Sequence, residues 1–339
     1  MRILVVGGAG FIGSHMTRML VDEGHDAVAL DNLSTGHRDA VPARALVKAD
    51  LSQRILLDKI LSTRNFDGVM HFAGSQQIGE SVAHPEKYYW NNVAATLHLL
   101  DAMVRRRLNR IVFSSSAAIF GEPRYLPVDE THQKSPLNPF GRSKWMVEQI
   151  LADYERAHGV RSVCLRYFNA AGADPSGSLG ERHFPETHLV PRTLQAAAGR
   201  LPAIEIFGTD YPTPDGSCIR DYVHVTDVCR AHLLAMTHLL DRGRSRSYNL
   251  GNGRGHSVKE VVDAAARVTG AEIPVKECER RDGDPARLVA DSTMARRELG
   301  WQPRYADLDT IVAHAWAWER NRPSPGTGFR GGRDFEMVD

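Results

Sequence analysis

The amino end of the chain contains the feature that most constrains its fold. A short apolar run at 2–6 predicts a strand, an amphipathic run at 11–23 predicts a helix, and the segment GGAGFIG at 7–13 joins the two. Glycines in such a turn allow a tight bend, a close approach of the backbone to a pyrophosphate, and close packing of the helix on the strand. The free N–H groups at the start of the helix can then bind phosphate oxygens. This pattern predicts a dinucleotide site that includes Gly7, Gly10, Phe11, Ile12 and Gly13.

The remainder of the first half alternates short apolar runs with longer amphipathic stretches. Further strands are predicted at 27–30, 45–48, 67–72, 110–114 and 161–167, and the most regular helices at 84–107 and 141–158. Strands that alternate with helices form a parallel sheet that is covered on both faces. We therefore predict an α/β fold with a Rossmann-type, doubly wound parallel sheet over residues 1–170.

The pattern changes after Asn169. Residues 172–188 are rich in glycine, proline, serine and charge, which predicts a long functional loop. Short helices at 190–200, 226–242, 257–269 and 292–299 then alternate with brief strands. This arrangement predicts a smaller mixed α/β domain for the substrate at 171–320, followed by a loose tail at 321–339.

Charge and cysteine content exclude several classes of function. The 42 basic and 41 acidic residues nearly cancel, so nothing favours nucleic acid or an anionic membrane as a partner. No apolar run approaches the roughly 20 residues that cross a bilayer. The four cysteines lie far apart without a CxxC pair, which favours reduced thiols over a disulfide framework or a zinc site. We expect a cytoplasmic enzyme without a metal.

Two acidic positions extend the predicted dinucleotide site. Asp31 ends the second strand, 18 residues past Gly13, where a carboxylate can accept hydrogen bonds from the adenosine ribose. The same charge would repel a 2′-phosphate, so NAD is favoured over NADP. Asp31 could instead cap the turn that follows it. Asp50 and Leu51 follow the third strand and either meet the adenine or cap a helix.

Several longer stretches are characteristic of one family. They are GGAGFIG, DNLSTG, HFAG, GESVAHPEKYYWNNV, FSSSAAIFG, NPFGRSK, LRYFNAAGADPSG and DGSCIRDYVHVTD, and the likeness extends from residue 1 to about residue 300. In these stretches the chain resembles the extended short-chain dehydrogenase/reductase family, and within it the UDP-glucose (UDP-galactose) 4-epimerases. The resemblance implies that a tyrosine takes the proton from O4 of a UDP-hexose while C4 gives a hydride to bound NAD. The 4-keto sugar then turns over and is reduced on its other face.

The catalytic positions implied by the resemblance are Ser116, Phe140 and Lys144. Positions 140 and 144 share a helix face, but Phe140 stands where the family has its tyrosine. Losing a positioned general base costs on the order of 100- to 10,000-fold in rate. We favour an engineered Tyr→Phe substitution over a natural loss that leaves a binding protein or a feeble enzyme. Ala117 and Ala118 follow Ser116, where related dehydratases and decarboxylases carry an acidic residue, which argues against those reactions.

The resemblance also implies the remaining contacts. For the cofactor these are Asn32, Phe72, Ala73, Gly74, Asn91, Ser114, Lys144 and Tyr167. For the UDP-sugar they are Ser116, Asn169, Leu189, Phe207, Arg220, Arg281, Asp284 and Leu288. The planar fork of an arginine suits a diphosphate, and a carboxylate suits a ribose hydroxyl. Either arginine could instead form a surface ion pair.

Three alternatives follow from particular residues. Leu288 is intermediate in size for a residue beside the sugar, so UDP-N-acetylglucosamine is an alternative substrate. The cations Arg182, His183, His188 and Arg192 would suit UDP-glucuronate, although solvated loop charges are favoured. A non-catalytic sensor of NAD and UDP-sugar is an alternative of another class, supported by Phe140 alone.

The helix at 84–107 also bears on the oligomeric state. It carries an apolar stripe of Val93, Leu97, Leu100 and Val104. Together with the helix at 141–158, this helix resembles those through which family members dimerise. A homodimer is therefore predicted, although burial in the core explains the stripe almost as well.

Overall fold

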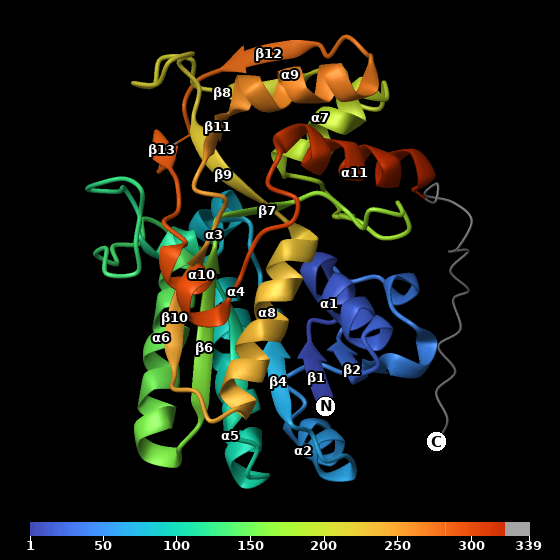
Figure 1. The fold of residues 1–339 in the computed structure, drawn as a ribbon, viewed down its shortest axis with the longest axis vertical. Coiled ribbons are helices and arrows are strands. Elements are labelled where there is room, and N and C mark those ends of the chain that lie inside the picture. Colours follow the sequence, from blue (N-terminus) through green and yellow to red (C-terminus); the bar gives the residue numbers. More distant parts are fainter. Residues whose placement is uncertain (282, 323–339) are drawn as a thin grey trace.

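A seven-stranded sheet forms the centre of the larger part of the molecule (Figure 1). The computed structural model describes residues 1–281 and 283–322. The strands of this sheet are β1 (Arg2–Val6), β2 (Asp26–Asp31), β3 (Leu46–Lys48), β4 (Gly68–His71), β5 (Arg110–Ser116), β6 (Arg161–Tyr167) and β10 (Arg246–Leu250). Their order is β10-β6-β5-β4-β1-β2-β3, and all neighbours are parallel. The predicted Rossmann-type α/β fold is confirmed.

Side chains of each strand alternate between two apolar cores. Ile3 and Val5 of β1 pack in the core covered by α1 (Phe11–Asp22), α8 (Val225–Leu240) and α10 (Thr293–Leu299). Leu4 and Val6 pack in the core under α2 (Arg54–Thr63), α5 (Ala95–Arg105) and α6 (Pro139–His158). Because both faces are covered, the strands are continuous apolar runs, which is why the sequence predicted them.

The connections on this sheet include one helix that differs from expectation. The helix predicted at 84–107 is divided into α4 (Pro85–Tyr88), a π-helical segment at Tyr89–Ala94, and α5. Within the π segment, Asn92 accepts the N–H of Ser75 and donates its amide to the backbone oxygen of Ser75 and to Oγ of Ser143. A π turn inserts one residue into the helical repeat, so it directs Asn92 toward the loop after β4. The shorter pieces are α3 (Ile78–Ala83) and 3₁₀ turns at Arg38–Ala40, Ala43–Ala45 and Ala117–Ile119.

A smaller unit lies beyond the carboxyl ends of the large sheet (Figure 1). Its strands are β7 (Asn169–Ala171), β9 (Ile219–His224), β11 (Gly255–Ser257) and β13 (Arg287–Leu288), with β9 in the middle, and the separate parallel pair β8 (Ile204–Phe207) and β12 (Val275–Cys278). Its helices are α7 (Leu189–Ala197), α9 (Val258–Thr269) and α11 (Leu308–Asn321). These helices enclose an apolar core of their own, which includes Leu194, Val261 and Ile311.

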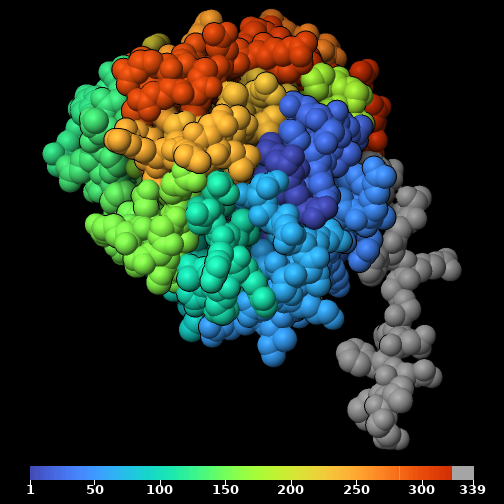
Figure 2. Space-filling view, turned by 60° about the horizontal axis from the view of Figure 1, so that its bottom comes forward, coloured from blue at the N-terminus to red at the C-terminus, as the bar shows by residue number. Residues whose placement is uncertain are grey.

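The chain returns to the large sheet after residue 170. Strand β10 and helix α8 belong by sequence to the region expected for the substrate domain, but β10 pairs with β6 and α8 covers the large sheet. Figure 2 shows the first half of the chain, blue through green, in one continuous surface with yellow and orange residues of the second half. The expected boundary at 170 therefore does not separate the strands of the two sheets, because pairing with β6 adds β10 to the large sheet.

The carboxyl end gives a second difference. Helix α11 was not among the predicted helices, and its last residue, Asn321, falls within the tail predicted at 321–339. Residues 323–339 of that tail lie outside the described residues. Among the helices of the described part, none has the length and apolar character that a membrane span requires.

Candidate functional site

A cavity of about 820 Å³ lies at the carboxyl ends of the large sheet, facing the smaller unit. Its walls come from the residues that end or follow β1, β2, β4, β5 and β6, and from the loops of the smaller unit. In an open parallel sheet this edge is where ligands bind, at the point where the order of the crossovers reverses. That point lies between β1 and β4, so the glycine segment after β1 borders the cavity.

The glycine segment has the shape that a pyrophosphate requires. A Cβ on Gly13 would lie 2.0 Å from the carbonyl oxygen of Gly7, so only glycine lets α1 pack this close to the turn. Gly7 has a φ of +77°, and a Cβ there would lie 2.5 Å from the backbone nitrogen of Ala73. At Gly10 a Cβ would meet nothing nearer than the Gly7 oxygen at 3.5 Å, because that side opens to the cavity. These contacts fit a dinucleotide held at the start of α1.

Asp31 caps the loops around it, as one of its two suggested roles requires, and it also faces the cavity. Its carboxylate accepts the N–H of Ala9 at 2.9 Å and that of Leu33 at 2.8 Å, so it organises the loops around it. It also lines the cavity, where it can meet a ribose. Asp50 accepts hydrogen bonds from Asn32 and Ser52. Burial alone would raise the pKa of Asp50, but the hydrogen bonds from Ser52 and Asn32 lower it.

Most of the predicted cofactor residues lie together in the wall of the cavity. They are Gly7, Gly10, Phe11, Ile12, Gly13, Asp31, Asn32, Asp50, Leu51, Phe72, Ala73, Gly74, Asn91 and Tyr167. Ser114 and Lys144 lie behind this wall: Oγ of Ser114 is 3.0 Å from Nε2 of His232, and Nζ of Lys144 donates to the backbone oxygen of Ser114. Those two residues therefore support the wall and do not form its surface.

Phe140 and Lys144 lie near each other, as their spacing predicts, and Ser116 lines the same cavity as Phe140. Helix α6 begins at Pro139, and the side chain of Asn138 caps it by accepting the N–H of Gly141 at 2.9 Å. This start places Phe140 in the cavity wall near the end of β5, where Ser116 also lines the cavity. One turn later, Nζ of Lys144 lies 6.0 Å from the centroid of the Phe140 ring.

The ionisation of the groups around Phe140 can be stated from their burial. Burial lowers the pKa of Lys144 to about 8, so this side chain is still mainly a cation at neutral pH. Burial raises the pKa of Tyr167, a neighbour in the cavity wall, to about 12. A phenol that holds its proton so firmly is a poor general base at neutral pH. Tyr167 is therefore unsuited to replace a tyrosine at position 140.

The predicted substrate residues divide into two groups. Ser116, Asn169, Arg220, Asp284 and Leu288 line the same cavity as the dinucleotide segment. The guanidinium of Arg220 lies 3.2 Å from Oδ1 of Asp284 and donates to the backbone oxygen of Pro285 at 2.7 Å. These contacts hold the cation at the cavity wall with a carboxylate beside it.

Leu189, Phe207 and Arg281 are not part of the wall that the described residues form. Leu189 begins α7 and packs on the core of the smaller unit. The guanidinium of Arg281 stacks on the ring of Phe207, 3.6 Å from its centroid. This cation–π contact holds the two side chains together and leaves the N–H donors of the guanidinium free for a ligand. The roles predicted for these three positions stay predictions.

Comparison with known proteins agrees with this geometry. Residues 3–251 match the model of the NAD dependent epimerase/dehydratase family. The chain belongs to this family. The predicted cofactor, NAD, is thereby confirmed.

The relatives within the family have similar lengths and folds. The UDP-glucose 4-epimerase of Halalkalibacterium halodurans is 49% identical, over 95% of this chain and 97% of its own. That of Azospirillum brasilense is 50% identical, over 94% of this chain and 92% of its own. The structure of the UDP-glucose 4-epimerase from Brucella ovis in complex with NAD has a TM-score of 0.91, with 50% identity over 93% of this chain and 97% of that one.

In this member of the epimerase/dehydratase family, the cavity wall also contains a group that the sequence alone does not bring together. Glu181, His183 and His188 line the cavity, and Glu186 lies beside them in the loop before α7. Burial alone would raise the pKa of Glu181, but the facing imidazoles of His188 and His183 lower it. Burial would lower the pKa of His183 and of His188. The facing carboxylates of Glu181 and Glu186 have the larger effect, so the pKa of both histidines is raised. The two histidines were predicted as solvated loop cations or as partners of a UDP-glucuronate carboxylate, because nothing in the sequence pairs them with Glu181 and Glu186.

Proposed function

We propose that this chain is a UDP-hexose 4-epimerase that interconverts UDP-glucose and UDP-galactose, and that Phe140 impairs its activity. The observation that carries the proposal is that Ser116 and Phe140 line the same cavity as Arg220 and Asp284, with Nζ of Lys144 6.0 Å from the centroid of the Phe140 ring. A hexose held between these walls would have its reacting carbon beside the serine and position 140. The names of the relatives, UDP-glucose 4-epimerases, support the choice of substrate.

The mechanism assigns a task to each group of residues. NAD, when bound, supplies a nicotinamide that accepts and returns the hydride of C4. The turn at Gly7 to Gly13 holds its pyrophosphate, and Asp31 accepts from the adenosine ribose. Arg220 binds the diphosphate of the substrate and Asp284 a hydroxyl of its ribose. The hydroxyl of Ser116 forms a hydrogen bond with the O4 hydroxyl of the sugar, and this bond orients the hydroxyl that must lose a proton.

Phe140 removes one step of this sequence. A base at position 140 would take the proton of O4, and the cation of Lys144 would favour its charged form. A phenyl ring accepts no proton, so turnover is expected to fall by on the order of 100- to 10,000-fold. The ring otherwise fills the same space, because phenylalanine and tyrosine differ by one oxygen. Binding of NAD and UDP-sugar should therefore survive in this chain.

The test is the Phe140→Tyr substitution with three substrates. UDP-glucose, UDP-N-acetylglucosamine and UDP-glucuronate are each followed for epimerisation by both proteins, with bound NAD measured after release. Strong epimerisation of UDP-glucose by the substituted protein alone supports the proposal. Phe120→Tyr is the matched control, because Phe120 is also a buried phenylalanine but is not a residue of the cavity wall. It should leave activity at the level of the starting chain.

Other outcomes would change the proposal. Turnover of the N-acetyl sugar would make Leu288 the residue that admits it, and turnover of UDP-glucuronate would point to the loop cations. If neither protein turns over any of these sugars while both still bind NAD and UDP, the chain is better described as a non-catalytic sensor. Equal activity in both proteins would refute the role given to position 140.

The homodimer is part of the proposal on weaker grounds. Leu100 of the predicted apolar stripe is buried, and Val93 and Val104 pack against the core of the large sheet. The core therefore already accounts for much of the stripe. Trp90, at the start of the same helical region, is 74% exposed and could contribute to a partner surface. Sedimentation that gives a monomer mass would remove the dimer from the proposal.

A further inference from the structure

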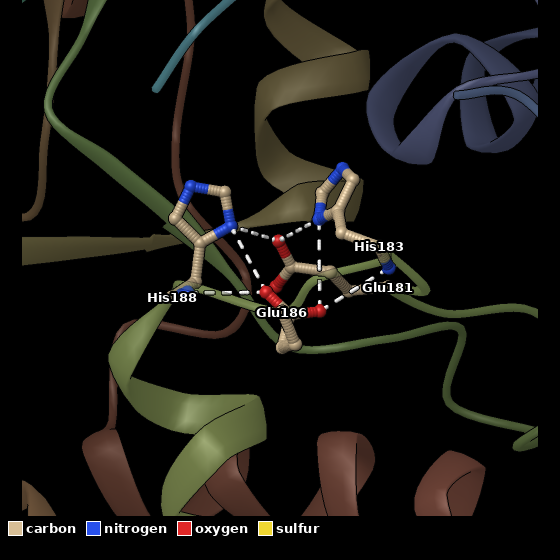
Figure 3. A group of neighbouring side chains, drawn as sticks. All are labelled: Glu181, His183, Glu186 and His188. Carbon is tan, nitrogen blue, oxygen red and sulfur yellow. Dashed lines mark hydrogen bonds and ion pairs between the residues drawn. The ribbon is translucent and has the colours of Figure 1, made fainter. Parts of the chain in front are cut away.

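We propose that the side chains of Glu181, His183, Glu186 and His188, here called the Glu-His cluster, form a binding site for a divalent transition-metal ion of the Zn²⁺ class. Figure 3 shows the four side chains converging from one loop on a common point. One ligand atom from each lies within 4.8 Å of the other three. No metal was predicted from the sequence, because the cysteines lack the spacing of a zinc site and this loop carries no ligand motif.

The separations between the ligand atoms match a small tetrahedral site. Zinc binds histidine nitrogen and carboxylate oxygen at about 2.0–2.2 Å, so neighbouring ligands of a tetrahedral ion lie roughly 3.3–3.6 Å apart. Nδ1 of His183 is 3.2 Å from Oε1 of Glu181 and 3.6 Å from Oε2 of Glu186. Nδ1 of His188 is 3.6 Å from Oε1 of Glu186. Each of these distances is near the spacing that an ion requires, although the two to Glu186 involve different oxygens of its carboxylate.

The remaining contact shows what an ion would replace. Nδ1 of His188 and Oε1 of Glu181 form a direct hydrogen bond. An ion between them would exchange this bond for two coordinate bonds. Nδ1 of His183, in contrast, is buried and meets hydrogen-bond geometry with no group of the described residues, although two carboxylates flank it. This nitrogen thus faces the point where the ion would lie, and because the carboxylates raise the pKa of His183, ion binding would displace a proton from the ring.

The surroundings hold the ligands in place. Glu181 and Glu186 are only 5% and 9% exposed. Oε1 of Glu186 accepts the N–H of Thr187 at 2.9 Å and that of His188 at 3.0 Å, which fixes the carboxylate. Nε2 of His183 lies 3.2 Å from the carboxamide of Gln76, which can accept its proton once the amide oxygen faces the ring. Such second contacts orient ligands and raise their affinity for metal.

Charge and ligand type select the ion. Two buried carboxylates with two neutral imidazoles carry a net charge of −2, which one divalent cation neutralises. Imidazole and carboxylate together suit zinc-like transition ions, whereas calcium and magnesium prefer oxygen ligands alone. The competing arrangement without metal is two ion pairs between protonated histidines and the carboxylates. With or without a metal ion, the cluster joins the loop at 172–188 to the start of α7. The two arrangements differ in whether the histidines bind an ion or carry protons.

The test measures Zn²⁺ binding to the full chain with its NAD, without any turnover. After chelator treatment and dialysis, calorimetric titration with Zn²⁺ should give one bound ion per chain. Co²⁺, used as a second probe, should give the visible absorption of a tetrahedral N₂O₂ site. Glu181→Gln, His183→Gln and His188→Gln should each weaken Zn²⁺ binding by at least about 10-fold, because loss of even a supporting contact has that effect.

Two further choices keep the result decisive. His84→Gln removes an exposed histidine that already faces Glu86, so it should leave Zn²⁺ binding unchanged. His188 has a side chain that is 43% exposed, so its substitution should fold even if the buried ones do not. The proposal is overturned if the chain binds no Zn²⁺, or if His188→Gln binds it as tightly as the starting chain. Since no step requires catalysis, this result does not depend on the function proposed for Phe140.

Discussion

The cation of Lys144 should make a phenol introduced at position 140 unusually acidic. Nζ of Lys144 lies 6.0 Å from the centre of the Phe140 ring. At that distance and an effective dielectric constant of about 20, a unit charge stabilises a phenolate by about 2.8 kcal/mol. This energy corresponds to about a 100-fold increase in the acid dissociation constant. Burial acts in the opposite direction, and Tyr167, whose pKa burial raises to about 12, shows its effect in the same wall.

The assay is the near-ultraviolet absorption of phenolate as a function of pH. The starting chain contains nine tyrosines, and it differs from Phe140→Tyr by a single hydroxyl, so subtraction leaves only the introduced phenol. The control is Lys144→Met in the Phe140→Tyr background, which keeps most of the length of the side chain and removes its charge. The phenol of this double variant should be about 100-fold less ionised at the same pH.

The pH range follows from Lys144 itself. Burial lowers the pKa of Lys144 to about 8, so its charge acts in full below that pH and disappears as the pH rises through it. The two groups therefore titrate as a coupled pair, and the difference between the variants should be largest below pH 8. Identical phenolate titrations with Lys and Met at position 144 would refute the role of the lysine in the proposed mechanism.

Two further predictions concern stability. Arg166 and Glu148 form an ion pair whose side chains are 5% and 4% exposed. Arg166→Met should lower the free energy of unfolding in urea by about 3–5 kcal/mol, because it leaves Glu148 charged and unpaired. The added change Glu148→Leu should recover much of this loss, and no recovery would contradict the reasoning. Burial raises the pKa of Asp221 to about 6, so its contribution to stability is present below its unfolded pKa of about 4 and is lost as the pH rises through 6. The free energy of unfolding should fall by up to about 3 kcal/mol across this range, and the fall should be absent from Asp221→Asn when the two proteins are compared at each pH.

The strands of the large sheet could be predicted because their signal is local. Strands β1 and β6 have the bounds that their apolar runs predicted, at 2–6 and 161–167. Each is buried on both faces, so apolar residues dominate the middle of the run, and the glycine segment after β1 fixes where the first strand ends. In the same way, the spacing of Phe140 and Lys144 is enough to predict that both lie on one helix face.

Two elements of the second half show where such local signals end. Helix α11 does carry one: Asp307 caps it by accepting the N–H of Thr310, and Leu308, Ile311, Val312 and Ala315 follow the helical spacing. The prediction missed this helix although its signal is present. Strand β10, with the sequence RSYNL, is different, because it is no continuous apolar run and its bounds were not predicted. Its pairing with β6 joins residues about 80 positions apart, so no local signal shows it.

The Glu-His cluster was hidden for a third reason, which concerns charge. A chain with a net charge of +1 gives no sign of where opposite charges are concentrated. Positions 181, 183, 186 and 188 follow neither the helical nor the strand repeat, so no pattern places their side chains on one face. The loop itself directs them inward: backbone N–H groups at 183, 187 and 188 bind the carboxylate of Glu186, and the indole of Trp318 donates to the backbone oxygen of Glu181. Because α11 supplies that tryptophan, the helix missed in the sequence also helps to position the cluster that the sequence did not reveal.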